Sequence, residues 1–436
     1  MTDRVDPSTK HQVPSTSTGV ARRLFHDHHF HPFGYVGMVL GLELMDSPDL
    51  GLLLARVADH ACKVEGAIIG TRVNDESLAE RRLPTAAEID DVISDRPVLL
   101  YRYCGHIAIA NSAALALAGV DADTADPDGG SIDRDAGGRP TGVLRETAIG
   151  LVSSVVGPLV CPPDDDQIIA ALATLPAMGI GSVTGIVSFG SGIWGGAVSE
   201  LDELIRLSPR LPVDMSVLVI TDHPAELTEA KERLSRAEGR VGFHGWKDFS
   251  DGSLGGHTAA MYEPFNDRPE TRGTVRLDHR QALEMALTSI SLGGVAAIHA
   301  IGDRANDLVL DVMVDVIGEG VRPELLRVEH ASVLTDRTIQ RFADLGVTAS
   351  VQPAFLASEE TWLEKRLGPQ RMSRAYPFRS LLEAGVPLLG GSDSPVEHPN
   401  PETGINAAVT RHGINPDQAL SREQAESLFT PPNLRW

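Results

Sequence analysis

The sequence is poor in cysteine and in long apolar runs, and each scarcity excludes a class of protein. Its 436 residues include three cysteines, Cys62, Cys104 and Cys161, which form no CxxC pair. Neither a disulfide framework nor a thiolate zinc site is therefore expected. No stretch reaches the ~18 apolar residues that cross a bilayer, and the N-terminus lacks the apolar segment of a signal peptide. We expect a cytoplasmic protein without a membrane partner.

Positive charge is also scarce. The chain carries 38 basic and 60 acidic residues, which gives a formal net charge of -22. An acidic surface of this kind repels nucleic acid and anionic membranes, so both are excluded as partners. The acidic excess does not define a substrate, and the partner that we expect is a small molecule.

Phosphate-binding loops are absent as well. No GxGxxG or GxxxxGK[ST] stands at a first strand–helix turn, which argues against a nucleotide-binding fold. From about residue 163 the chain instead repeats an amphipathic helix, a closing glycine and a short apolar strand. Glycine just past a helix end supplies the left-handed residue that turns the chain. Helices are predicted over residues 168–178, 282–292, 336–345 and 378–384.

Repeated helix–strand units with apolar strands predict an α/β fold with a parallel sheet. Between a doubly wound sheet and a TIM-type (β/α)8 barrel, the barrel is favoured. A barrel takes ~250 residues, so this chain must also carry an insertion. We predict a disordered tail over 1–20, the first barrel strand within 21–42, an inserted lid domain over 43–160, the rest of the barrel over 161–430 and a tail over 431–436. The alternative for 43–160 is a set of loops without a core of its own.

The first predicted strand is rich in histidine and reads LFHDHHFHP. Residues two apart in a strand point to the same face, so His29 and His31 would project together into the barrel mouth. Two imidazoles from one strand form a chelating pair for a borderline metal ion. His26 and His28 have the same spacing in the opposite parity, and the residues alone leave that register open.

Lysine is rare, and one lysine lies in an apolar strand. Lys247 stands in GWKDFSDGS, where a buried ammonium is costly without a partner. One solution is a neutral amine that reacts with CO2 and gives a carboxylated lysine able to bridge two metal ions. The alternative is a surface lysine that pairs with Asp248 or Asp251.

Three further polar residues end predicted strands in the same way. His299 ends VAAIHA, His330 ends LRVEH and Asp393 ends VPLLGGSD. Each taken alone fits a structural role, and Asp393 fits a helix cap. Together with His29, His31 and Lys247 they all fall at the carboxyl ends of strands, where barrel enzymes carry their chemistry. The joint pattern predicts a metal site.

The residues then match a family. The chain resembles the amidohydrolase superfamily, in the YtcJ-like branch (amidohydrolase family 3) that includes N-substituted formamide deformylases. The resemblance runs from about Leu24 to about Thr430 and rests on FHDHHFHP, CGHIAIANSAAL, GGSIDRDAGGRPTGVL, KDFSDGSLGGHTA, HAIGDRAND, RVEHASVL and GSDSP. Phe25, Asp27 and Pro32 fall in place only if His29 and His31 are the ligands.

The resemblance implies a metal-dependent hydrolase that cleaves a non-peptide carbon–nitrogen bond with a metal-activated hydroxide. It implies that His29, His31 and Asp393 bind one ion, that His299 and His330 bind the second, and that carboxylated Lys247 bridges them. Two Zn(2+) ions are expected, with Mn or Fe as alternatives. The catalytic residue would be Asp393, which takes a proton from water and returns it to the leaving amine. Should Lys247 carry no carbamate, the site would hold one metal.

The resemblance also predicts residues that line the substrate pocket. These are His106 and Asn111 in CGHIAIAN, for which holding the insertion together is the alternative, and His257, where relatives usually carry arginine.

One part of the family pattern is not found. Relatives have a β-sandwich before the first histidine pair and after GSD, whereas this chain has a polar tail before Ala21 and ends at Trp436. A naturally minimal barrel, cover by another chain such as a second copy in a homodimer, and a truncation all stay open. The alternative functions are a lactone or ester hydrolase on the same metals and a non-catalytic ligand-binding barrel.

Overall fold

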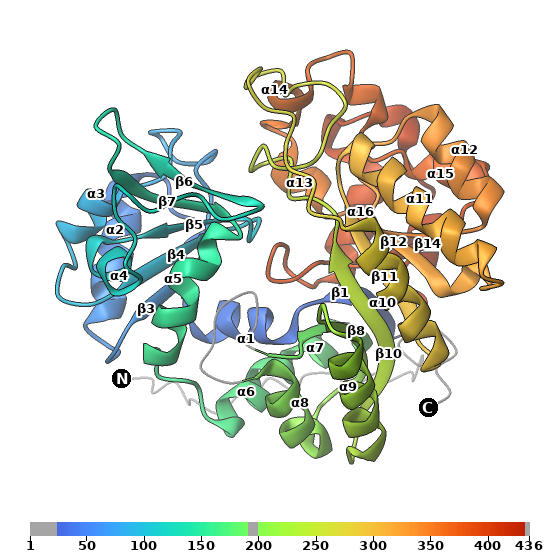
Figure 1. Cartoon of the computed structure of the whole chain (residues 1–436), viewed down its shortest axis with the longest axis horizontal. Coiled ribbons are helices and arrows are strands. Elements are labelled where there is room, and N and C mark those ends of the chain that lie inside the picture. The colour runs from blue at the N-terminus through green and yellow to red at the C-terminus, as the bar shows by residue number, and fades with distance from the viewer. Residues whose placement is uncertain (1–23, 191–198, 432–436) are drawn as a thin grey trace, which may run out of the picture.

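The computed structural model describes residues 24–190 and 199–431 (Figure 1). The expected tail over 1–20 lies outside these residues, as do 432–436. Two sheets make up the described chain, one of eight strands and one of six.

The eight-stranded sheet is parallel throughout, in the order β1-β8-β9-β10-β11-β12-β13-β14. Its strands are β1 (Phe25–Phe30), β8 (Ile180–Ser188), β9 (Asp214–Ile220), β10 (Val241–Phe249), β11 (Val295–Ala300), β12 (Leu326–His330), β13 (Thr348–Val351) and β14 (Leu388–Gly390).

The first strand meets the segment that follows the last strand, and this contact closes the sheet. Phe30 forms a parallel bridge with Ser394. The backbone N–H of His31 donates to the carbonyl of Ser394 at 2.9 Å, and the N–H of Asp393 donates to the carbonyl of His29 at 2.8 Å. The predicted α/β barrel is confirmed.

Helices cover the outside of the barrel (Figure 1). Those between barrel strands, or leading into them, are α6 (Asp165–Leu172), α7 (Thr174–Ala177), α8 (Glu200–Leu207), α9 (Pro224–Arg236), α10 (His279–Ser291), α11 (Asp303–Gly318), α12 (Asp336–Leu345), α13 (Phe355–Glu359), α14 (Leu363–Leu367) and α15 (Phe378–Glu383). Two more follow β14, namely α16 (Pro401–Thr410) and α17 (Arg422–Ser427).

Two helix predictions show what local sequence decides. The helix over 336–345 is confirmed as α12, with the Thr335 hydroxyl accepting from the Thr338 N–H at 3.1 Å and Gly346 left-handed at φ 72°. The prediction of one continuous helix over 168–178 is wrong, because α6 stops at Leu172 and α7 follows it. A proline ring clashes with the carbonyl four residues earlier, so Pro176 interrupts the helix at Leu172.

The second sheet is built between β1 and β8, and it appears on the left of Figure 1. Its order is β2-β3-β4-β5-β7-β6, parallel at β2, β3 and β4 and antiparallel beyond. The strands are β2 (Leu42–Glu43), β3 (Ile68–Val73), β4 (Val98–Arg102), β5 (Ile107–Ala110), β6 (Gly130–Arg134) and β7 (Pro140–Glu146). The helices of this region are α1 (Pro32–Leu40), α2 (Leu50–Ala61), α3 (Ala86–Asp90), α4 (Ser112–Leu117) and α5 (Ala148–Val156).

This region has an apolar core of its own. Leu99, Tyr101 and Leu144 from the sheet are fully buried, and Val152 of α5 belongs to the same cluster. Such a core disagrees with the alternative of loops alone. The boundaries 43–160 and the function of a lid stay predictions.

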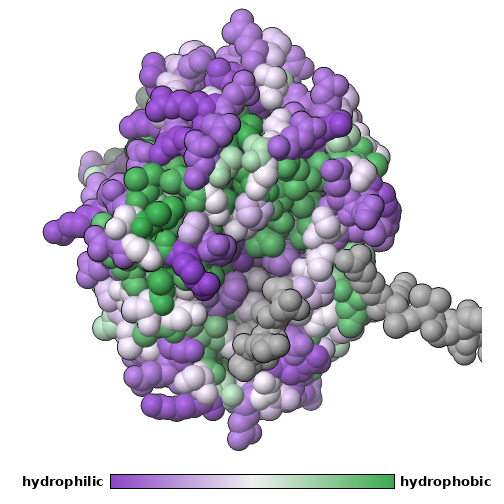
Figure 2. Space-filling view, turned by 90° about the vertical axis from the view of Figure 1, so that its right-hand side faces the viewer, coloured by the Kyte–Doolittle hydropathy of each residue, from purple (hydrophilic) through white to green (hydrophobic). Residues whose placement is uncertain are grey.

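The surface opposite the second sheet is mixed in polarity. Figure 2 shows hydrophobic areas on the face formed by the barrel side, set among hydrophilic ones. Within 24–190 and 199–431, no helix is both long and apolar enough to cross a membrane. The expected cover by a second copy of the chain stays a prediction.

Candidate functional site

Three of the predicted ligands converge at the closing seam of the barrel. His29 lies in β1, His31 directly follows that strand, and Asp393 follows β14. The Nε2 atoms of His29 and His31 lie 3.0 and 3.2 Å from the same atom, Asp393 Oδ1. The backbone bonds that close the barrel join these same residues, so barrel closure itself sets their spacing.

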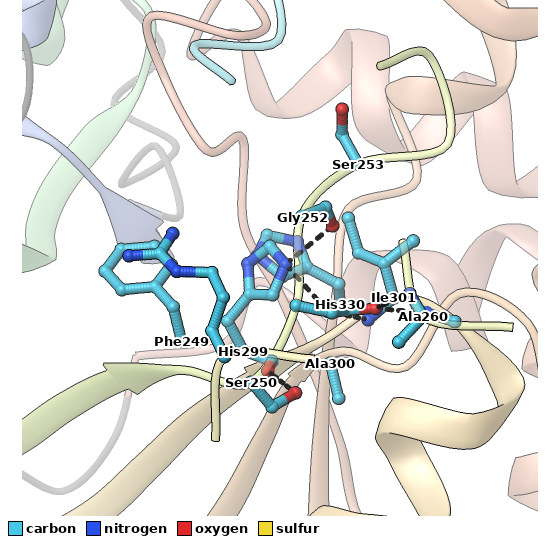
Figure 3. A network of polar contacts seen from close by, with 12 residues as sticks. Phe249, Ser250, Gly252, Ser253, Ala260, His299, Ala300, Ile301 and His330 are labelled. Carbon is cyan, nitrogen blue, oxygen red and sulfur yellow. Dashed lines mark hydrogen bonds and ion pairs between the residues drawn. The ribbon is translucent and has the colours of Figure 1, made fainter. Parts of the chain in front are cut away.

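His330 and His299 extend this cluster along neighbouring strand ends, and Figure 3 shows the two rings side by side. The ring centroids of His29 and His330 are 4.9 Å apart, and those of His299 and His330 are 4.4 Å apart. One ligand atom each from His29, His330 and Asp393 lie within 4.8 Å of one another, and all three residues are buried.

The backbone is strained at two of these residues. His330 has φ 75° and Asp393 has φ 57°, in the left-handed region that side chains other than glycine adopt at a cost. Strain of this kind persists only where the surrounding structure over-determines it, and it gathers at functional sites. Both outliers therefore mark the same cluster.

Lys247 lies in β10, near its carboxyl end, and is buried. Its Nζ donates to the Asp248 carbonyl at 3.1 Å and lies 3.6 Å from the centroid of the Phe249 ring. Burial lowers the pKa of Lys247 to about 8, although Glu329 and Asp393 act to raise it. The alternative of an exposed lysine paired with Asp248 or Asp251 disagrees with this placement.

A second layer of buried side chains orients the histidines. His29 Nδ1 donates to Glu329 Oε2 at 2.6 Å, and His330 Nδ1 donates to Gln352 Oε1 at 2.7 Å. These bonds place a proton on Nδ1, so that Nε2 is the electron-pair donor whenever the ring is neutral. His299 differs, because its Nε2 lies 3.0 Å from the Gly252 carbonyl and 3.2 Å from Asp251 Oδ1.

Within the cluster, the surroundings of His29 favour a positive charge. Burial acts to lower the pKa of His29, yet the carboxylates of Asp393 and Glu329 raise it to about 9. Burial also opposes ionisation of Asp393, but His29 and His31 hold the pKa of that carboxyl well below its usual range. A buried anion surrounded by imidazole nitrogens is a suitable place for a cation, so the residues present fit a divalent metal ion.

Sequence reasoning missed Glu329 and Gln352. The signal was a glutamate in the apolar strand that ends RVEH and a glutamine just after VTASV. Both side chains are buried, and Arg327 Nη2 lies 2.8 Å from Glu329 Oε1.

We expect Glu329→Gln to lower metal affinity by about 10- to 100-fold, because an amide holds the His29 ring less firmly than a carboxylate. Competition with a coloured chelator measures this, and unchanged affinity would contradict the orienting role.

The side chains of His26 and His28, the alternative pair, form hydrogen bonds outside the cluster. The ring of His26 bonds to Ser182 Oγ at 2.7 Å and to Thr184 Oγ1 at 3.0 Å. His28 Nε2 bonds to the carbonyl of Thr430 at 3.1 Å. Neither ring contacts Asp393 through a hydrogen bond in the described chain, so the register with His29 and His31 at the site is the one observed.

A cavity opens onto the cluster between the barrel and the second sheet. His299, His330 and Asp393 form part of its wall, and Tyr103, Cys104 and His106 come from the turn between β4 and β5 of the second sheet. The other lining residues are Ser253, Leu254, Gly255, Ile301, Phe355, Ser358, Glu359 and Val396. The site is thus shared by the two sheets.

The three residues predicted to line the pocket lie at different positions relative to the cavity. His106 lines the cavity, with its Nδ1 donating to Glu146 Oε2 at 2.9 Å. His257 is not among the lining residues, and its Nε2 lies 3.1 Å from Asp267 Oδ1.

Asn111 is not brought to the cavity. Its Oδ1 accepts from the N–H groups of Val98 and Ala114, each at 3.0 Å, where it caps α4. Its Nδ2 donates to the carbonyls of Ile93 and Arg96, also at 3.0 Å. Its hydrogen-bonding capacity is therefore used inside the second sheet, and a pocket role for Asn111 disagrees with the structure.

A parallel barrel with buried histidines and an aspartate at the carboxyl ends of its strands defines the class of barrel hydrolases that hold metal ions. Within this class, the chain belongs to the amidohydrolase family, whose sequence profile matches residues 24–432.

Known relatives agree with this assignment. The chain is 32% identical over 407 residues to the putative amidohydrolase YtcJ of Bacillus subtilis, covering 93% of this chain and 76% of that protein. It is 28% identical over 374 residues to the N-substituted formamide deformylase of Arthrobacter pascens, covering 83% and 68%. The solved structure of an uncharacterized metal-dependent hydrolase from Pyrococcus furiosus superposes with a TM-score of 0.67 at 31% identity, covering 93% of this chain and 80% of that chain. The chain is therefore a hydrolase of the YtcJ-like branch.

Proposed function

We propose that the protein is a metal-dependent amidohydrolase that cleaves a non-peptide carbon–nitrogen bond. The observation that supports this most is the convergence of His29 and His31 Nε2 on Asp393 Oδ1 beside the cavity. The relative from Arthrobacter pascens acts, by its name, on N-substituted formamides. An amide of that general type is the substrate that we assign.

Six residues would hold the cofactor, namely His29, His31, Lys247, His299, His330 and Asp393. Divalent ions bound there, two Zn(2+) or else Mn or Fe, would supply Lewis acidity and make water nucleophilic near neutral pH. Lys247 would bridge them as its carbamate. Its burial and its lowered pKa, about 8, support this role, because CO2 reacts with the neutral amine. An unmodified Lys247 with a single ion is the alternative.

Asp393 would move the proton. Its side chain lines the cavity and is ionised, because neighbouring imidazoles hold the pKa of its carboxyl well below its usual range. As the water oxygen attacks the amide carbon, Asp393 accepts a proton from that water. It then donates the proton to the amine nitrogen, so that the C–N bond breaks and a carboxylic acid and an amine leave.

A second function rests on the same site, because activated water also attacks lactones and esters. The test is a panel of N-substituted formamides and acetamides against lactones and esters of matched size. We expect the metal-loaded protein to hydrolyse the amides faster than the metal-free protein does. Turnover of esters alone would contradict the amide assignment. Turnover of nothing in metal-loaded protein would favour the non-catalytic ligand-binding barrel.

A further inference from the structure

One wall of the cavity carries a buried glutamate with an unused oxygen. Glu359 of α13 lines the cavity and is 8% exposed. Its Oε2 accepts from the Tyr376 hydroxyl at 2.6 Å, whereas its Oε1 has no hydrogen-bond partner among the described residues. Leaving a buried polar atom unpaired is costly, so this oxygen marks a place for a group that donates a hydrogen bond to it.

Phe355, one helical turn before Glu359, relates this carboxyl to the histidine cluster. Residues four apart in a helix lie on the same face, and both of these side chains line the cavity. The Phe355 ring stacks on the ring of His330, with centroids 6.1 Å apart and planes 14° apart. The wall therefore continues from the histidine cluster, past an aromatic ring, to the Glu359 carboxyl.

A hydroxyl from the second sheet faces the same cavity. Tyr103 directly follows β4, lines the cavity and is 3% exposed. Its hydroxyl has no hydrogen-bond partner within the described chain. A phenol oxygen can accept a hydrogen bond as well as donate one. The barrel and the second sheet thus each present one unpaired oxygen to the cavity.

The wall holds carboxyl groups but, in the described chain, neither lysine nor arginine. Besides histidine, its ionisable acidic side chains are Glu359 and Asp393. Arg102 and Arg366 do not line the cavity, and each pairs with carboxylates elsewhere: Arg102 with Asp75, and Arg366 with Glu76 and Asp267. A net charge of -22 also attracts cations to the protein as a whole. The cavity is therefore better suited to a cation than to an anion.

We propose that Glu359 and Tyr103 form a subsite that binds a cationic nitrogen of the substrate, at the end away from the bond that is cleaved. The inference rests on the proposed function and deepens it, because it names the substrate class: a small amide that carries an ammonium group. The carboxylate and the phenol oxygen would accept hydrogen bonds from the ammonium. Phe355, Leu254 and Val396 are buried lining residues that would contact the carbon chain between the two ends.

The protonation of Glu359 gives this subsite a signature. Burial raises the pKa of Glu359 to about 8, and the carboxyl of Glu397 acts in the same direction. The hydrogen bond from Tyr376 and the guanidinium groups of Arg102 and Arg366 act to lower it. Without a ligand the group is therefore mostly neutral at pH 7. A bound cation favours the carboxylate, so binding should release a proton.

The subsite is tested on the metal-loaded protein with matched probes. N-(3-aminopropyl)formamide, N-butylformamide and N-formyl-β-alanine serve as cationic, neutral and anionic substrates of similar length. Butylammonium and butan-1-ol serve as ligands in calorimetric titration. The variants are Glu359→Gln, which removes the charge and keeps the size, and Tyr103→Phe, which removes only the hydroxyl. Glu360→Gln and Tyr262→Phe are the controls, since these side chains are 53% and 48% exposed.

We expect the parent protein to favour the cationic over the neutral formamide by about 10-fold in kcat/KM, with the anionic one poorest. Glu359→Gln should abolish this preference, and Tyr103→Phe should lower it about 3-fold. Both controls should keep it. Butylammonium should bind more tightly than butan-1-ol at pH 7 and release about one proton, measured in buffers of different ionisation enthalpy. Glu359→Gln should release none.

Three results would overturn the subsite. They are a parent that prefers the neutral or anionic formamide, a preference for the cation that Glu359→Gln leaves unchanged, and butylammonium binding without proton release. Turnover that ignores the ammonium would thus keep the proposed function and remove the subsite. Butylammonium binding that Glu359→Gln weakens, without turnover of any amide, would keep the subsite and overturn the proposed function.

Discussion

Asp393→Asn is expected to retain bound metal and to lose turnover by about 10³-fold. The amide keeps an oxygen near the Nε2 atoms of His29 and His31, which lie 3.0 and 3.2 Å from Oδ1 in the parent. It cannot accept and return a proton, however, so the step that releases the amine fails. Steady-state kinetics together with metal analysis of the same sample separate the two effects.

The control is Asp311→Asn, because Asp311 pairs with Arg341 on an exposed helix surface at 2.6 Å. That variant should keep both metal and turnover. Turnover in Asp393→Asn within a few fold of the parent would refute the proton-transfer role. Loss of metal together with turnover would instead show that Asp393 acts mainly as a ligand.

Lys247→Ala is expected to lose one metal equivalent and to lower turnover by about 10²-fold or more. Lys247 is 1% exposed, and the carboxylates of Glu329 and Asp393 act to raise its pKa against the effect of burial. Removing it leaves a space in which a short carboxylate could take the place of a carbamate.

Adding acetate or propionate at millimolar concentration should therefore restore part of the activity of Lys247→Ala. Lys231→Ala is the matched control, because Lys231 is partly exposed and its Nζ lies over Phe243, 5.4 Å from the ring centroid. Full metal content and turnover in Lys247→Ala would remove the bridge from the mechanism.

The fold could be predicted because its signals are local. A glycine after a helix and a hydroxyl before one decided α12, whose bounds match the prediction. Where the prediction failed, at 168–178, a second local rule competed, since Pro176 acts on the carbonyl of Leu172. The second sheet was harder to foresee, because it changes from parallel pairing at β2, β3 and β4 to antiparallel pairing beyond, without the repeated helix–strand unit of the barrel.

Some residues of the site could likewise be predicted from the sequence, and others could not. The six proposed ligands stand at or just beyond strand ends, which sequence periodicity reveals. Glu329 and Gln352 could not be assigned, because each acts on a histidine through strand register: β12 carries Glu329 to His29, and β13 carries Gln352 to His330. Asn111 was misplaced because a capping asparagine and a pocket asparagine look alike in sequence.

Metal content per chain tests the central claim most directly. The protein is purified with bicarbonate and without chelators, and zinc, manganese and iron are measured by elemental analysis. We predict about two equivalents per chain, held by the cluster of His29, His31, His299, His330, Lys247 and Asp393. About one equivalent would keep the hydrolase and remove the carbamate bridge. Essentially none, in folded protein that also refuses added metal, would contradict the metal-dependent mechanism.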